Sequence, residues 1–167
     1  MNKSVKPVSI HSNPQIRPVE SKDFAFIRSL AAEFSTFTVP SEYLLWLLTR
    51  FHPDYCRVIE QDSGTLKAYL LAMPTSDPPN GIAVWQIAAA HPNQAFALEY
   101  FAAYLRDLVE RYGAASISFT MQKNSASLRL IRSLAKQFFG CDAVQLDSVP
   151  AGQEEYEFRV SVGGASL

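Results

Sequence analysis

Apolar residues recur at intervals of three and four in four stretches of the chain, the spacing that places side chains on one face of a helix. The pattern predicts helices over residues 21–34, 41–51, 94–112 and 124–138. The third helix is the clearest, because its apolar positions share one face and Gly113 follows directly as a C-cap. On the second helix, Tyr43 belongs to the apolar stripe and Trp46 lies off it.

Between these helices the period of the apolar residues changes from 3.6 to 2, which is typical of strands. Residues 61–64 have the composition of a hairpin turn, and residues 74–81, with three prolines and an Asn-Gly pair, that of a loop. Strands are predicted over residues 15–19, 55–60, 65–73, 82–90, 114–121, 143–146 and 156–162.

The resulting order of elements is β-α-α-β-β-β-α-β-α-β-β. It predicts an α/β (α+β) fold with a mixed, mostly antiparallel central sheet and about four flanking helices. Helix crossovers should make the sheet parallel across the two later helices. We expect a single domain over residues 15–163, preceded by a flexible tail over residues 1–14 that Pro7 and Pro14 interrupt.

Composition narrows the classes of partner. Of 167 residues, 48% are hydrophobic and 19% charged, which is typical of a globular domain. The net charge of −1 gives no reason to expect a nucleic acid or a membrane as partner, and no apolar run approaches the roughly 20 residues that span a bilayer. Cys56 and Cys141 stand far apart without a CxxC motif, so we expect no metal site, no disulfide and a cytoplasmic location.

Residues 82–98, IAVWQIAAAHPNQAFAL, carry the most specific chemical prediction. An apolar strand ends at His91-Pro92, and an amphipathic helix begins almost at once. The first N–H groups of a helix have no partner within it and lie at the positive end of its dipole. Strand and helix together therefore predict an anion cradle, of the kind used by cofactors that carry a pyrophosphate.

Three segments carry a family resemblance. They are Val84-Trp85-Gln86-Ile87-Ala88, then Ser41-x-Tyr43 with Cys56-x-Val58 downstream, and Asn124-Ser125-Ala126-Ser127 leading through Leu130 to Arg132-Ser133-Leu134-Ala135. With the order of elements, they make the chain resemble the GCN5-related N-acetyltransferases (the GNAT superfamily), and most of all the diaminobutyrate acetyltransferases of ectoine biosynthesis. The family motifs are V-W-Q-V-A, N-S-x-Y and N-x-x-S…L-F-R-S-F-A, and the resemblance spans about residues 15–140.

The resemblance implies an enzyme that transfers acetyl from acetyl-CoA, its co-substrate, to a primary amine of a small molecule, an amino acid or a diamine. The amine would attack directly in a ternary complex, within a splayed cleft beside the strand at 82–90 and with backbone donors holding the oxyanion. A homodimer is compatible with it. The cofactor-binding residues that it implies are Ile87, Ala88, Ala89, Gln94, Ala95, Phe96, Ala97, Leu98, Asn124 and Ser127. The substrate-binding residues that it implies are Ser41, Tyr43, Trp85 and Gln86.

The chain departs from the family pattern at three places. The Q/R-x-x-G-x-G/A loop is Gln94-Ala95-Phe96-Ala97 here, and we expect the methyl groups of its alanines to crowd the phosphates and weaken binding. The tyrosine that protonates the leaving thiolate in many acetyltransferases falls at Ile131. Residues 38–41 lack the acid and the Asn of the diaminobutyrate family. A catalytically weakened GNAT-fold module for binding or assembly is therefore the alternative function.

Several of these residues also have an alternative structural role. Trp85 could form a wall of the acceptor pocket or belong to the core. Tyr43 could line the acceptor site or belong to the core. Asn124 could cap a helix or contact CoA. Because Trp85 and Gln86 are consecutive on a strand, we expect them on opposite faces of the sheet. Spacing selects no catalytic base, and the catalytic residues stay unassigned. The candidates for the base are Glu60, His91, Asp147, Glu154 and Glu155.

Overall fold

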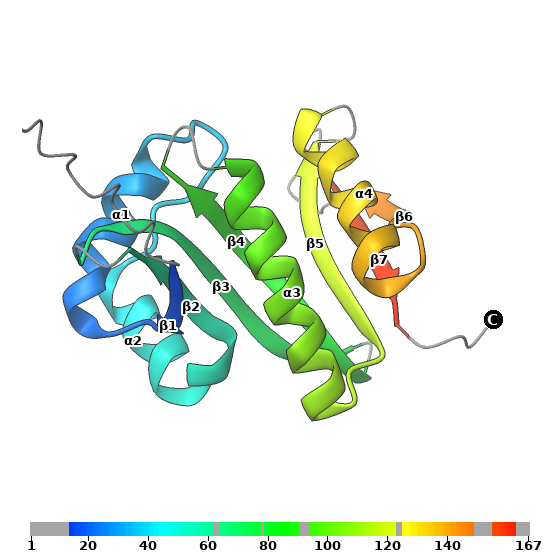
Figure 1. Ribbon diagram of the computed structural model, residues 1–167, viewed down its shortest axis with the longest axis horizontal. Helices are drawn as coiled ribbons and strands as arrows, with labels where there is room; N and C mark the ends of the chain where they lie inside the picture. The colour runs from blue at the N-terminus through cyan, green and yellow to red at the C-terminus, as the bar shows by residue number, and fades with distance from the viewer. Residues whose placement is uncertain are drawn as a thin grey trace, which may run out of the picture.

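The structure is a computed structural model, and it describes residues 14–61, 64–77, 79–90, 94–122, 125–148 and 155–162 (Figure 1). Residues 1–13 of the expected tail and residue 163 of the expected domain lie outside this part. The helices are α1 (Phe24–Ala32), α2 (Glu42–Phe51), α3 (Gln94–Tyr112) and α4 (Ala126–Phe139), with the short 3-10 helices η1 (Ser21–Asp23) and η2 (Pro53–Tyr55). The strands are β1 (Gln15–Pro18), β2 (Cys56–Glu60), β3 (Leu66–Ser76), β4 (Pro79–Ala89), β5 (Ser116–Gln122), β6 (Val144–Ser148) and β7 (Glu155–Ser161).

The described strands form one sheet in the order β1-β2-β3-β4-β5-β7-β6. All neighbours are antiparallel except β4 and β5, which the α3 crossover joins in parallel. The α/β class and the mixed, mostly antiparallel sheet are thus confirmed. The second expected parallel pair does not form, because β7 lies between β5 and β6 and pairs with both in antiparallel fashion.

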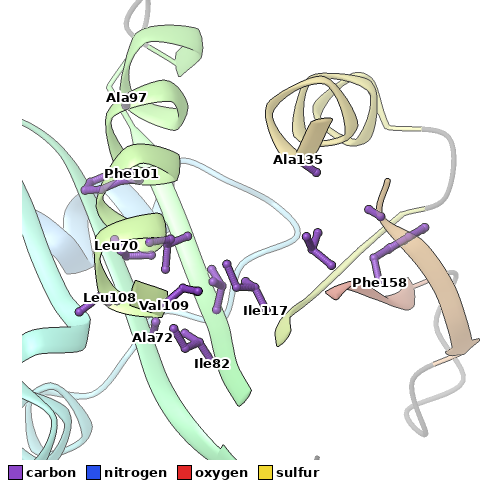
Figure 2. Packing of buried hydrophobic residues seen from close by; sticks show 14 of the residues in the cluster. Leu70, Ala72, Ile82, Ala97, Phe101, Leu108, Val109, Ile117, Ala135 and Phe158 are labelled. Carbon is purple, nitrogen blue, oxygen red and sulfur yellow. The ribbon is translucent and has the colours of Figure 1, made fainter. Parts of the chain in front are cut away.

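Alternate side chains of β3 point to opposite faces of the sheet and divide the core in two. Leu70 and Ala72 belong to the cluster beneath α3 and α4, whereas Tyr69 and Leu71 belong to the cluster that contains α1 and α2. Figure 2 shows the first cluster, in which Phe101 and other side chains of α3 pack toward the sheet. Each face of the sheet is therefore covered by helices. No helix in the described ranges is both long and apolar enough to cross a membrane.

The buried face of α2 differs from the predicted one. Leu45 and Leu48 are its buried residues, while Tyr43 is 68% exposed and Phe51 64% exposed. Residues 43–48 are all apolar, so their spacing does not single out one face. The core role considered for Tyr43 is therefore wrong.

The loop predicted for residues 74–81 is also wrong, because β3 runs on to Ser76 and β4 begins at Pro79. Beyond Leu71, β3 still pairs with β4 but no longer pairs with β2. A proline is tolerated in a strand where no second partner needs its N–H, and Pro74 stands in this section. The extended hairpin lengthens β4 at the end that pairs with β5.

Candidate active site

The central feature of the site is the separation of β4 from β5. Their parallel ladder covers Gly81–Val84 and Ser116–Phe119. Past it, β4 stays with β3 as far as Ala89 and β5 stays with β7 as far as Gln122, so the two strands diverge toward the end where α3 begins (Figure 1). A cleft of about 540 Å³ opens between them. The divergence begins directly after Val84, two residues before Ile87, the first of the cofactor-binding residues that the resemblance implies.

A β-bulge in β4 sets the orientation of the side chains at the mouth of the cleft. Leu71 pairs with Gln86 and Ala72 with Val84, which leaves Trp85 as an extra residue. A bulge breaks the alternation of side chains along a strand. Trp85 packs against the cluster that contains α1 and α2, and Gln86 bonds to Tyr69 of that same cluster. The expectation that Trp85 and Gln86 face opposite sides of the sheet is therefore wrong.

The segment between α1 and α2 lies along one side of the cleft. Phe34, Thr36, Phe37 and Thr38 all line the cavity together with Trp85 and Gln86. Sequence reasoning missed these four as site residues, because the signal is only an F-S-T-F-T run between two helices.

Gln86 connects that segment to the sheet. Its Nε2 donates a hydrogen bond to the Thr38 carbonyl at 2.7 Å, and its Oε1 accepts one from the Tyr69 hydroxyl at 3.1 Å. Gln86 is 6% exposed, and burial raises the pKa of Tyr69, so this phenol stays protonated and donates. Both ends of the Gln86 amide are thus satisfied within the protein.

The beginning of α3 lies beside the open end of the cleft. Ala95 is exposed and Phe96 is 37% exposed, whereas Leu98 and Ala102 line the cavity. Ala97 is 1% exposed and belongs to the core beneath α3 (Figure 2). Its methyl group therefore packs inward, and the expectation that it crowds a phosphate is wrong for this residue. The first turn of α3 holds no acidic side chain.

The first turns of α4 form the opposite side of the cleft. Ser125 is the N-cap of α4, and its hydroxyl accepts a hydrogen bond from the Leu128 N–H at 3.1 Å. The cap suggested for Asn124 therefore belongs to Ser125, and Asn124 itself lies outside the described residues. Ser127 and Ile131 both line the cavity, so the position expected for a thiolate-protonating tyrosine faces the cleft with an isoleucine.

Two predicted substrate residues lie elsewhere. Ser41 caps α2 by accepting a hydrogen bond from the Leu44 N–H at 3.1 Å, and Tyr43 stacks on Trp46 with ring centroids 5.9 Å apart. Neither lines the cleft. The structure instead brings together the predicted residues Ile87, Ala88, Ala89, Leu98, Ser127, Trp85 and Gln86.

The candidates for the catalytic base do not converge on this cleft within the described residues. Glu60 forms an ion pair with Arg17 at the β1–β2 end of the sheet. His91 and Glu154, and the side chains of Asp147, Glu155 and Gln94, lie outside what the structure describes. In the described part of the chain, no three His, Cys, Asp or Glu side chains are grouped so that they could hold a metal ion.

Comparisons with known proteins find chains of similar structure. No protein-family model and no curated protein matches the sequence. A diaminobutyrate acetyltransferase from Paenibacillus lautus, solved with its substrate L-2,4-diaminobutyric acid and coenzyme A, superposes with a TM-score of 0.72 at 23% identity, over 90% of this chain and 95% of that one. Ard1 from Thermoplasma volcanium gives 0.72 at 14% identity, over 90% and 98% of the two chains.

A third solved structure, an acetyltransferase of the GNAT family from Bacillus anthracis, gives a TM-score of 0.62 at 13% identity, over 91% of this chain and 98% of that one. Each match covers about nine tenths of this chain and nearly the whole of the other one, so the likeness extends over the fold as a whole. The fold of this chain is the GNAT fold.

Proposed function

We propose that this chain is an N-acetyltransferase that transfers acetyl from acetyl-CoA to a primary amine of a small molecule. The observation that carries the proposal is the divergence of β4 and β5 beside the beginning of α3. It places two strand edges and the α3 residues Leu98, Ala102 and Leu105 around one cavity of about 540 Å³, so the first turn of α3 precedes the residues that line it. The fold likeness to acetyltransferases, one of them solved with coenzyme A, supports this function.

The cleft and the first turn of α3 beside it fit two parts of acetyl-CoA, the pantetheine arm and the pyrophosphate. The edge of β4 over Ile87–Ala89 offers backbone groups that could pair with the amide-bearing pantetheine arm. The free N–H groups of the first turn of α3, from Gln94 to Ala97, suit a pyrophosphate, and that turn adds no acidic side chain against it. Ser127 contributes a hydroxyl from α4. The fit needs no glycine at residue 97, since the methyl group there is buried.

The chemistry would depend on positioning more than on a covalent intermediate. Acetyl-CoA supplies an activated thioester when bound. The acceptor nitrogen would attack the acyl carbon, a C–N bond would form as the C–S bond breaks, and the sulfur would leave as a thiolate while the nitrogen loses a proton. A backbone N–H of β4 would stabilise the negative charge that develops on the acyl oxygen. The side chains along the α1–α2 segment would hold the amine for this attack.

Amines of the two kinds that the resemblance implies, amino acids and diamines, are the first acceptors to test, because the Paenibacillus lautus enzyme was solved with L-2,4-diaminobutyric acid. The direct test is calorimetric titration of the purified protein with acetyl-CoA, with free CoA as the comparison. Mass spectrometry of amine mixtures incubated with the protein and acetyl-CoA then follows. Saturable one-site binding with acetylation of any amine is the expected result. No binding at millimolar acetyl-CoA would overturn the proposal and leave the non-catalytic binding module as the function to pursue.

A further inference from the structure

Three aromatic side chains form one wall of the cleft at its α1–α2 end. Phe34, Phe37 and Trp85, here called the aromatic wall, all line the cavity and are all partly buried. The Phe34 and Phe37 rings are stacked, with centroids 4.9 Å apart and planes inclined by 26°. All three pack against the cluster that contains α1 and α2, so each ring presents one side to the protein and another to the cavity.

The aromatic wall is held in place by the fold before any ligand binds. The Phe37 N–H donates to the Phe34 carbonyl at 3.1 Å, which closes the turn that stacks the two rings. The next residue, Thr38, is tied to β4 through the Gln86 side chain. A surface that is already ordered loses little conformational entropy on binding, so its contacts contribute to affinity more fully.

Among the described residues that line the cleft, the polar groups beside the aromatic wall are neutral, and the Gln86 amide already has hydrogen-bond partners. The Gln86 amide is bonded at both ends, and Thr36 and Thr38 offer hydroxyl groups. Moving a carboxylate or a second ammonium group from water onto such a surface costs desolvation free energy. A hydrogen bond to a neutral hydroxyl does not compensate for that cost. An apolar or aromatic body, by contrast, gains from leaving water and from stacking on the exposed ring faces.

We infer that the acceptor is a monoamine with an apolar or aromatic body, such as a phenylalkylamine, whose body lies on the aromatic wall. This inference rests on the proposed acetyltransferase function and deepens it by naming the class of acceptor. The apolar body packs on Phe34, Phe37 and Trp85, while its amine extends toward the diverging end of β4. The inference separates this chain from acceptors that carry a second charge, diaminobutyrate among them.

The experiment compares acceptors at equal concentration with saturating acetyl-CoA and measures kcat/KM by mass spectrometry of the product. The panel is 2-phenylethylamine, n-butylamine, 1,4-diaminobutane, L-2,4-diaminobutyrate and a short peptide with a free N-terminus. We expect kcat/KM for 2-phenylethylamine to exceed that for each acceptor with a second charged group by about tenfold or more. This is the scale on which an apolar site discriminates between substrates.

Two matched variants test the aromatic wall itself. Thr36→Asp places a carboxylate on an exposed residue that lines the cleft, and Ser35→Asp places the same charge on the exposed residue beside it, which does not line the cleft. We expect Thr36→Asp to shift the ratio of kcat/KM values from 2-phenylethylamine toward 1,4-diaminobutane by about tenfold, and Ser35→Asp to leave the ratio unchanged. Both positions are exposed, so neither change should unfold the protein.

The outcomes separate the inference from the function on which it rests. If acetyl-CoA does not bind, or no amine is acetylated, the proposed function fails and the inference with it. If acetyl-CoA binds and diaminobutyrate, the diamine or the peptide is preferred over 2-phenylethylamine, the function stands and the inference is overturned. An equal response of the ratio to both Asp variants would also overturn it, because the charge would then act from outside the aromatic wall.

Discussion

The Gln86 side chain on β4 and the Thr38 carbonyl before α2, 48 residues apart, are joined by a hydrogen bond of 2.7 Å. Since Gln86 also accepts from the Tyr69 hydroxyl, one buried amide links two strands of the sheet to the segment that carries Phe34 and Phe37. This side chain therefore helps to hold the α1–α2 segment against the sheet at this end of the cleft. A buried amide with both ends satisfied is also costly to remove.

Gln86→Leu should loosen the α1–α2 segment without touching the end of the cleft assigned to the cofactor. The variant leaves the Tyr69 hydroxyl and the Thr38 carbonyl unpaired, and we expect a loss of about 1–3 kcal/mol in the free energy of unfolding. The KM of the amine should rise several-fold while the Kd of acetyl-CoA stays within twofold, as measured by steady-state kinetics and calorimetry. The exposed Gln137→Leu on α4 is the control. An equal loss of acetyl-CoA affinity in Gln86→Leu would contradict this division of the cleft.

The features that sequence predicted well are those with a long or repeated signal. The bounds of α3 agree with the prediction at both ends, because five turns of one apolar stripe followed by Gly113, with φ of 64°, leave little freedom. The order of elements and the separation of β4 from β5 are also as expected. The position of the cleft came from family resemblance, and the geometry of the strands then confirmed it.

The features that sequence missed depend on single residues or on distant contacts. One extra residue at Trp85 makes the bulge that turns Trp85 and Gln86 to the same face. Because residues 82–90 are apolar except for Gln86, the break in alternation leaves no signal in the sequence. Phe37 becomes a site residue only through folding of the α1–α2 segment against β4. Ala97 lies on the apolar stripe of α3, which turns its methyl group inward. The loop motif of the family predicted a position beside a phosphate instead.

Ala95→Glu should change stability and cofactor binding in opposite directions. A negative side chain in the first turn of α3 favours the helix by about 0.3–1 kcal/mol. The same charge beside a pyrophosphate repels it, and we expect the Kd of acetyl-CoA to rise by roughly tenfold, which corresponds to about 1.4 kcal/mol. Thermal unfolding without ligand and calorimetry with acetyl-CoA measure the two effects. Ala95→Gln controls for size; an equal loss of affinity in this neutral variant would mean that bulk, and not charge, is responsible.

Asp23 should contribute stability that depends on pH. Burial by itself raises its pKa, but the paired hydrogen bonds from Arg17, at 2.7 and 2.9 Å, and the Glu20 N–H outweigh burial and lower the pKa below 3.8. The folded state therefore favours the charged form, so the contribution is complete well above pH 4 and is lost as the pH falls through the lowered pKa.

Asp23→Asn removes one of the two carboxylates that pair with Arg17, the other being Glu60. It should cost about 2 kcal/mol at pH 7, as measured by urea unfolding. The difference from the parent should shrink steadily between pH 4 and pH 2. Lys22→Gln, which removes a charge from an exposed pair, should change stability little over the same range, because water screens such a pair. A difference between Asp23→Asn and the parent that stays constant with pH would show that the lost contribution is packing rather than charge.

The two cysteines should differ in reactivity. Cys56 is fully buried, and burial raises the pKa of its thiol to about 11, so almost no thiolate forms at pH 8. Cys141 is partly exposed, with a pKa raised by burial to a smaller degree. A disulfide reagent should therefore label one thiol in the native protein and two after unfolding in guanidinium chloride. Cys141→Ser should remove the native labelling; labelling that persists in this variant would place Cys56 within reach of solvent.

Ser127→Phe should close the α4 side of the cleft and block acetyl-CoA. Ser127 is exposed, lies in the first turn of α4 and lines the cavity, so a phenyl ring there fills space without disturbing the core. We expect the Kd of acetyl-CoA to rise at least tenfold, with a change in unfolding free energy within about 0.5 kcal/mol. Ser133→Phe, an exposed position on the same helix that does not line the cavity, should bind acetyl-CoA as the parent does. Equal affinity in the two variants would mean that the cofactor does not pass beside α4, and the assignment of Ser127 to its site would be abandoned.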